Sequence, residues 1–289
     1  MNGRTGARFF LVLLLATGCG KKNADNNISY ADTPRAFEMK NSIREASGIA
    51  ASQRNPGYLW VEEDSNNPPQ LYLLKNDGTG FTTCYLKNAV NRDWEDIALA
   101  AGPDTGKQYI YIGEIGDNDG VHTESSFYRL EEPAAGTDTI GSYDKITFKY
   151  EDGPRDAEAF VIDNRTKDIF VISKRDSPSR LYRLSWPYRT DSMNTAKFVT
   201  NLSMSGVTSA ALSANGTELL IKTYTSLYYT KRSLTEPLAE VFSHPFTQLS
   251  YQLEPQGEAV CFARDSSGFY TLSETGAGLQ QNLYFYPKR

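Results

Sequence analysis

The chain has 289 residues, a formal net charge of −5 and only two histidines, His122 and His244. Its lysines and arginines are scattered and form no basic stripe, which argues against nucleic acid as a partner. The scarcity of histidine argues against a histidine-rich zinc site and leaves few possible bases for a Ser-His-Asp triad.

The N-terminus has the pattern of a bacterial export signal. Arg4 and Arg8 precede an apolar run over residues 9–16. About eight apolar residues are too few to span a hydrocarbon core of roughly 30 Å as a helix, so the run predicts a signal peptide over residues 1–18. The small residues before Cys19 are typical of a lipobox, in which the cysteine thiol is acylated and becomes the mature N-terminus. An ordinary secretory signal is the alternative.

Both hypotheses take the chain out of the cytoplasm. The lipobox predicts a lipid-anchored protein of the cell envelope with no other membrane contact, on the periplasmic or surface face of the outer membrane in a Gram-negative cell. Residues 19–27 are polar and without periodicity, so we expect a flexible tether there.

Residues 28–289 have a length that all-β propellers and barrels occupy as one domain. Cys84 and Cys261 allow at most one disulfide. Cys261 lies in the pattern of an inner strand and Cys84 in that of an outer one, so we predict two buried, unpaired thiols.

One sequence unit recurs along this domain. Its starts lie about 50 residues apart, with one interval of about 63 where residues 133–142 add a loop, and this spacing is typical of propeller blades. The aligned segments are Arg44-Glu45-Ala46-Ser47-Gly48-Ile49, Arg92-Asp93-Trp94-Glu95-Asp96-Ile97, Arg155-Asp156-Ala157-Glu158-Ala159-Phe160, Gly206-Val207-Thr208-Ser209-Ala210-Ala211 and Pro255-Gln256-Gly257-Glu258-Ala259-Val260.

Each copy continues with a second strand, a turn rich in Asn, Asp and Gly, a Tyr-rich third strand and usually a fourth strand. The second strands are expected at residues 58–62, 109–113, 168–173, 218–223 and 269–273, and the third at 70–73, 127–130, 181–184, 227–229 and 283–285. The last copy lacks a fourth strand, and the strand-like residues 28–39 before the first copy can supply it and protect the sheet edge. We therefore predict an all-β fold, a single β-propeller of five blades closed by an N-terminal strand, or of six blades if the long interval hides part of another sheet.

Acidic residues recur at two positions of the unit. The first position holds Glu45, Asp93, Asp156, Val207 and Gln256, and the position two residues later holds Ser47, Glu95, Glu158, Ser209 and Glu258. Positions i and i+2 of a strand share a face, so a closed ring would bring these side chains to one mouth of a central channel. The candidate metal ligands are Glu45, Asp93, Glu95, Asp156, Glu158 and Glu258.

Further charged residues are expected at the same mouth, because the end of an antiparallel second strand lies beside the start of the first. They are Glu63, Asp64, Glu114, Asp117, Lys174, Arg175, Lys222 and Glu274.

Three interpretations of the acidic positions compete. The carboxylates could accept backbone hydrogen bonds or pair with Arg44, Arg92, Arg155, Lys174 and Lys222, as buried charges require. They could converge with carbonyl groups on a hard cation, for which Ca²⁺ is the natural choice because oxygen ligands dominate. Two of them could act as acid and base, or hold a metal that activates water for hydrolysis.

With these copies aligned, the chain resembles a group of bacterial secreted propeller proteins, mostly of unassigned function, related to the TolB-like and phytase-like propeller superfamilies. The likeness covers roughly residues 43–289 and rests on Glu45-Ala46-Ser47-Gly48, Asp93-Trp94-Glu95-Asp96-Ile97-Ala98, Gly113-Glu114-Ile115-Gly116-Asp117-Asn118, Asp152-Gly153-Pro154-Arg155-Asp156-Ala157-Glu158-Ala159 and Gly257-Glu258-Ala259-Val260. It implies the fold more than the chemistry. Calcium-dependent phytases and gluconolactonase-like hydrolases use acidic groups at a propeller mouth, so the resemblance keeps hydrolysis open. The fourth copy departs from the pattern at Val207 and Ser209.

These patterns favour a monomeric binding module at the cell envelope, for a small molecule or an envelope protein, with an acidic mouth that holds a divalent cation. The alternative is a metal-assisted hydrolase of phosphoesters or of lactones and esters.

Overall fold

The computed structural model describes residues 29–276 and 279–289. Nearly all regular structure in these residues is β-strand, and the helix α1 (Leu238–Val241) has four residues. The predicted all-β class is therefore confirmed. The predicted signal peptide, the lipidated Cys19 and the tether lie outside the described residues. Within the described part of the chain, no helix has the length and apolar character needed to cross a bilayer.

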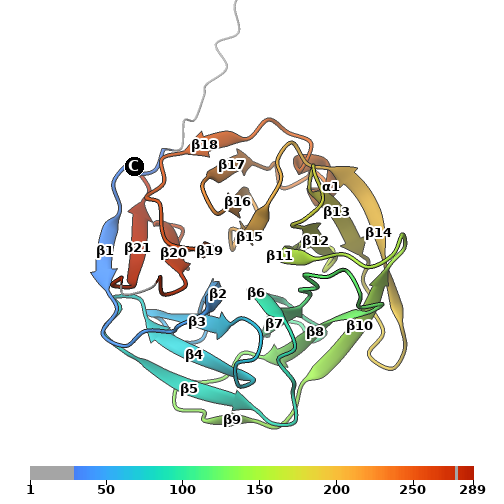
Figure 1. Ribbon diagram of the computed structural model, residues 1–289, viewed down its shortest axis with the longest axis horizontal. Coiled ribbons are helices and arrows are strands. Elements are labelled where there is room, and N and C mark those ends of the chain that lie inside the picture. Colours follow the sequence, from blue (N-terminus) through green and yellow to red (C-terminus); the bar gives the residue numbers. More distant parts are fainter. Residues whose placement is uncertain (1–28, 277–278) are drawn as a thin grey trace, which may run out of the picture.

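Antiparallel units surround a central axis (Figure 1). The innermost strand of each unit contacts the innermost strands of its two neighbours, so the ring is closed, last unit to first. These inner strands are β2 (Ala46–Ala51), β6 (Trp94–Ala101), β11 (Ala157–Ile162), β15 (Val207–Leu212) and β19 (Gly257–Phe262).

Each inner strand pairs with the strand that follows it, and that strand pairs with the next. The second strands are β3 (Tyr58–Glu63), β7 (Gln108–Glu114), β12 (Ile169–Ser173), β16 (Glu218–Thr223) and β20 (Gly268–Ser273). The third strands are β4 (Gln70–Lys75), β8 (Ser125–Glu131), β13 (Arg180–Leu184), β17 (Leu227–Lys231) and β21 (Asn282–Pro287). The predicted ranges match these strands to within a residue or two, because alternating apolar residues and turn residues are local signals.

The outer strands are β5 (Phe81–Leu86), β10 (Asp144–Tyr150), β14 (Asn194–Asn201), β18 (Thr247–Leu249) and β1 (Arg35–Glu38). β10 and β14 also pair with each other in parallel, which joins two neighbouring units into one eight-stranded sheet. The insertion predicted as a loop at residues 133–142 contains β9 (Thr139–Ile140), which pairs in parallel with β5 of the preceding unit.

The N-terminal strand closes the last sheet, as predicted. β1 pairs with β21 in antiparallel register, with Arg35 opposite Phe285 and Glu38 opposite Asn282. Tyr30 forms a further bridge with Lys288. The two ends of the domain therefore complete one four-stranded sheet.

The core lies between adjacent units, where side chains of one sheet pack on the next. Trp60 of β3 and Ile112 of β7 share one such cluster, and Phe127 of β8 and Phe160 of β11 share another. Inner strands are buried on both faces, which accounts for their nearly continuous apolar sequences. Cys84 and Cys261 are free and buried, as predicted.

Candidate metal centre at one end of the axis

Every inner strand has an irregularity near its start, at the same end of the axis. Its pairing with the second strand shifts there by one residue, which is a β-bulge. An extra residue at a bulge is unpaired and its side chain is re-aimed. The residues at the bulges are Ser47, Glu95, Glu158, Thr208 and Glu258.

The bulges correct the predicted alignment of the fourth copy. Ser209 was aligned with Glu95 and Glu158, but Thr208 occupies the bulge and Ser209 lies opposite Lys222. The alignment assumed a strand without a bulge. A shift of one residue in a strand moves each side chain to the other face, so the bulge changes which residue faces the axis. Ser209 Oγ instead donates to Asp96 Oδ1 at 3.3 Å, deeper in the axis.

Two overlapping groups of carboxylates lie beside the bulges. Asp64, Asp93 and Glu95 form one group, and Glu95, Asp156 and Glu158 form the other. Within each group, one oxygen of every residue lies within 4.8 Å of the others. The structure therefore brings together four of the predicted ligands and adds Asp64, which was predicted for the mouth but not as a ligand.

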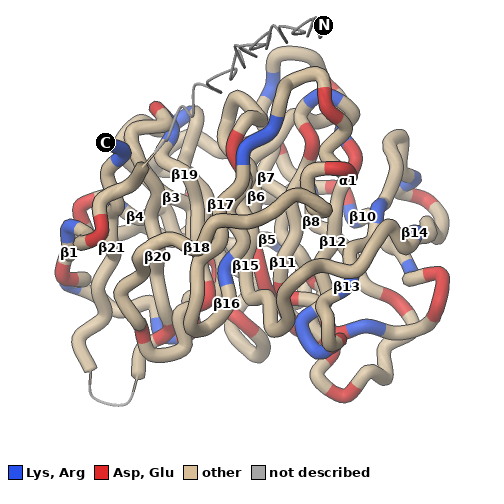
Figure 2. The backbone as a smooth tube through the Cα atoms, turned by 90° about the horizontal axis from the view of Figure 1, so that it is seen from above, with Lys and Arg blue, Asp and Glu red and all other residues tan. Residues whose placement is uncertain are grey.

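Glu258 and Glu274 extend this arrangement. Tyr224 Oη donates to Glu258 Oε1 at 2.7 Å, and the charge of Glu258 raises the pKa of Glu274. Glu45 is exposed at the rim, where Asn67 Nδ2 donates to its carboxylate, and it belongs to neither group. We call Asp64, Asp93, Glu95, Asp156, Glu158, Glu258 and Glu274 the mouth cluster. Figure 2 shows acidic segments, in red, beside β11 and β15 toward one face of the ring.

Other predicted mouth residues hold the entering loops. Glu63 accepts from the backbone N–H of Arg44 at 3.0 Å, and Glu114 accepts from that of Asp93 at 2.7 Å. Asp117 accepts from two backbone N–H groups of its own loop, each at 2.9 Å. These carboxylates are satisfied by the backbone, so they position the mouth cluster.

Few basic groups reach the mouth cluster. Lys174 Nζ pairs with Glu158 and donates to Tyr224 Oη at 2.8 Å, and Arg175 Nε lies 2.8 Å from Asp156 Oδ2. Lys222 is buried and donates to the Gly257 carbonyl instead of a carboxylate.

The repeated arginines do not neutralise the cluster. Arg92 Nε lies 3.7 Å from Glu114, and Arg155 pairs with Asp152 and Asp176. The seven carboxylates of the mouth cluster thus have two basic partners, Lys174 and Arg175, which leaves an excess of five negative charges when all are ionised. The interpretation by ion pairs alone does not account for this excess.

The excess of negative charge is accompanied by raised pKa values of the carboxyl groups. Burial and the nearby carboxylates together raise the pKa of Asp93 to about 7. Burial likewise raises the pKa of Glu158 to about 8, against the opposing effect of Lys174. Burial and the charge of Glu258 raise the pKa of Glu274 to about 8, and burial with Glu158 raises that of Glu95. Removing water from a carboxylate disfavours its charged form, and like charges add to the effect.

Several carboxylate oxygens in this region have no hydrogen-bond partner among the described residues. They include Glu158 Oε2, Glu258 Oε2 and both oxygens of Glu62. The three side chains belong to residues that are at most 4 % exposed. A buried oxygen without a donor is costly, so each requires a proton, a water molecule or a cation.

This donor set can hold a metal ion in principle. The two groups contain only carboxylates, and such oxygen ligands suit hard divalent cations such as Ca²⁺, Mg²⁺ and Mn²⁺. Gly116 permits the close approach of the neighbouring backbone, because a Cβ there would overlap the carboxylates of Glu95 and Asp93.

A second polar layer lies deeper along the axis. Asp96 of β6 is buried and accepts from the backbone N–H of Phe160 in β11 at 3.4 Å and of Ala210 in β15 at 3.5 Å. Glu62 and Asp96 were not predicted as site residues, although each lies next to a predicted acid in its strand, Glu63 in β3 and Glu95 in β6. Asp96 therefore links three inner strands, β6, β11 and β15, beneath the mouth cluster.

No protein-family model matches the chain, and no curated protein matches it.

Proposed function

We propose that the chain is a five-bladed β-propeller binding module whose mouth cluster holds a divalent cation, with Ca²⁺ as the best candidate. The ring of inner strands supports this architecture, since β9 adds only two residues to the edge of a neighbouring unit and forms no further sheet. The proposal agrees with the resemblance to secreted propellers. We also propose that Cys19 anchors a monomeric propeller to the cell envelope, where it binds a small molecule or an envelope protein.

One observation carries the cation proposal. Glu158 Oε2 and Glu258 Oε2 are buried and unpartnered in a cluster whose carboxylates outnumber its basic groups. A divalent cation would neutralise part of this charge and supply the missing partner. Calcium is favoured over magnesium because six to eight ligands at variable angles suit it, whereas magnesium requires a near-ideal octahedron.

Thermal melting of the mature protein with chelator and with added Ca²⁺ tests the proposal. A ligand selective for the native state at 100 times its Kd adds about 2.7 kcal/mol of stability. For a domain of this size that corresponds to a rise in Tm of roughly 5–10 °C. We expect this rise with Ca²⁺ and its loss in Glu95→Gln and Glu158→Gln.

The same variants have a second expected property. Each removes a buried carboxyl group whose ionisation is unfavourable, so in chelator each should melt no lower than the wild type. Glu124→Gln is the matched control, because Glu124 is exposed in a loop of the same mouth and lies outside both carboxylate groups. A wild-type Tm that is the same in chelator and in Ca²⁺, in protein shown to be metal-free, overturns the cation proposal.

The alternative proposal is a metal-assisted hydrolase. It is favoured by Arg175, which is largely exposed beside Asp156 and could receive an anionic substrate oxygen. Calcium-dependent release of nitrophenol from p-nitrophenyl phosphate, or opening of a simple lactone, would support it if Glu95→Gln abolished the activity. Calcium binding without turnover of either substrate supports the binding module.

A further inference from the structure

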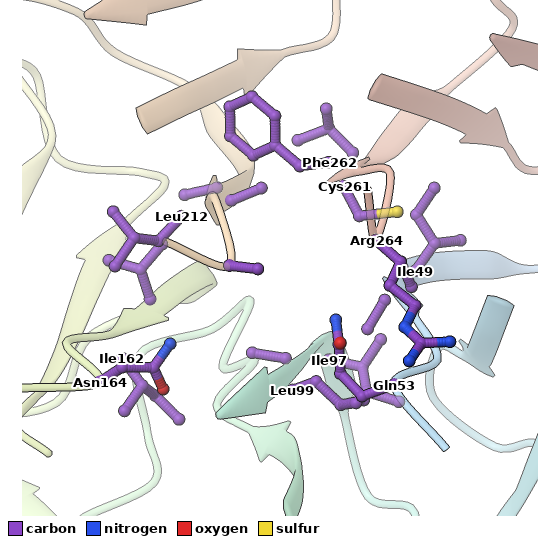
Figure 3. Close-up of a pocket in the computed structure, with 18 of the residues that line it drawn as sticks. Ile49, Gln53, Ile97, Leu99, Ile162, Asn164, Leu212, Cys261, Phe262 and Arg264 are labelled. Atoms are coloured by element: carbon purple, nitrogen blue, oxygen red, sulfur yellow. The ribbon is translucent and has the colours of Figure 1, made fainter. Parts of the chain in front are cut away.

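A separate cavity lies at the other end of the axis. Its volume is about 190 Å³, and its wall is built by the later residues of all the inner strands (Figure 3). Ile49, Ile97, Phe160, Ala210 and Val260 contribute one residue each from β2, β6, β11, β15 and β19. The mouth cluster lies at the starts of the same strands, so the two sites face opposite ends of the axis.

The polar layer at Asp96 separates the cavity from the mouth cluster. Asp96 accepts from the backbone N–H of Ile97, Phe160 and Ala210, and these three residues also line the cavity. Asp96 is 1 % exposed and does not line the cavity. A molecule in the cavity would therefore contact aliphatic and aromatic groups and not the mouth carboxylates.

The cavity has a polar rim around this apolar wall. Gln53, Gln108 and Asn164 provide amide groups, and Arg264 is its sole charged lining residue. Asn164 Oδ1 accepts from the Ala101 N–H at 2.8 Å, which leaves its amide N–H groups as donors. Figure 3 shows Arg264 at the edge of the opening, near Gln53 and Ile49.

Arg264 has no charged partner among the described residues. It is exposed, and none of the ion pairs or side-chain hydrogen bonds in residues 29–276 and 279–289 involves its guanidinium. An unpaired guanidinium over an apolar cavity is complementary to a ligand with an anionic head and an apolar body.

We propose that this cavity binds a small anionic amphiphile, a medium-chain carboxylate, with its chain along the apolar wall and its head at Arg264. A protein cavity of about 150 Å³ holds benzene, so this volume suits a body of about six to eight carbons. The proposal concerns a second site and does not depend on a cation in the mouth cluster.

Calorimetric titration of the mature protein with octanoate, octylamine and 1-octanol tests the proposal. The three probes share one chain and differ in the head group. We expect octanoate to bind more tightly than 1-octanol and octylamine to bind most weakly. Affinities should agree within about twofold in chelator and in Ca²⁺, because the layer at Asp96 separates the two sites.

Variants locate the site. Arg264→Gln should weaken octanoate binding about tenfold, the usual size of a lost charged hydrogen bond, and leave 1-octanol binding unchanged. Ala98→Leu, which narrows the cavity, should weaken both probes. Arg189→Gln is the control, because Arg189 is exposed and does not line the cavity. The proposal is overturned if octanoate produces no binding heat, if octylamine binds as tightly as octanoate, or if Arg264→Gln leaves octanoate affinity unchanged.

Discussion

In chelator, the protein should lose stability as the pH rises from about 5 to about 8, which is opposite to the usual behaviour of paired carboxylates. Burial and neighbouring carboxylates raise the pKa of Asp93 to about 7 and those of Glu158 and Glu274 to about 8. In the unfolded chain these groups titrate near their ordinary values of about 4. The folded state therefore retains protons that the unfolded state has released, and the stabilisation present below about pH 4 is lost as the pH approaches 8.

The magnitude follows from the number of retained protons. For each extra proton that the folded state retains, the free energy of unfolding falls by about 1.4 kcal/mol with every unit by which the pH rises. One proton retained at Glu158 throughout would lower it by roughly 4 kcal/mol between pH 5 and pH 8, a large part of a typical total stability of about 5–15 kcal/mol. Glu158 is 3 % exposed, so solvent screens this effect little.

Urea denaturation at several pH values, with chelator and with Ca²⁺, measures this slope. Acids with lowered pKa values, such as Asp77 and Asp104, change stability at more acidic pH and do not interfere. Histidine titrates in the same window, so the series is repeated with His122 and His244 replaced by glutamine. Glu158→Gln should reduce the slope by about 1.4 kcal/mol per pH unit, and Ca²⁺ should flatten it because the cation displaces the protons. Stability that is flat or rising over this window, in metal-free protein, would refute the reasoning.

Two other predictions concern the N-terminal part of the chain. A chain that starts at Glu45 lacks β1 and the buried side chains of Met39 and Ile43, so its free energy of unfolding should fall by about 5 kcal/mol. Equal urea midpoints for the shortened and the full mature chain would show that β1 does not close the ring. Cys19→Ser should abolish acylation and shift the protein from the membrane to the aqueous fraction of cells, and unchanged fractionation together with unchanged acylation would reject the lipid anchor.

Local sequence patterns determined most of the strand positions. Alternating apolar residues bounded by Asn, Asp and Gly located β3, β7, β12, β16 and β20 to within a residue or so, because strand pleat and turn geometry depend on near neighbours. The repeat spacing also predicted that the N-terminal strand would complete the last sheet, since an unpaired edge is unfavourable.

The assignment of the carboxylates depended on tertiary structure. Glu95 lies in an inner strand and Glu114 ends a second strand, yet Glu95 joins the mouth cluster whereas Glu114 accepts from the backbone N–H groups of Arg92 and Asp93 in the loop before β6. The bulge at Glu95 shifts the register by one residue, and such a shift has no clear local signal in the sequence.

The cavity at Arg264 lay beyond sequence analysis for a related reason. Its wall combines residues about 50 positions apart in the chain, and three of them, Ile97, Phe160 and Ala210, donate backbone hydrogen bonds to Asp96. The sequence by itself therefore determined the repeated strands and the residues available at each end of them. Only the packing of distant units around one axis decided which carboxylates are left without partners and which apolar side chains enclose a cavity, because both depend on contacts between strands that no local pattern specifies.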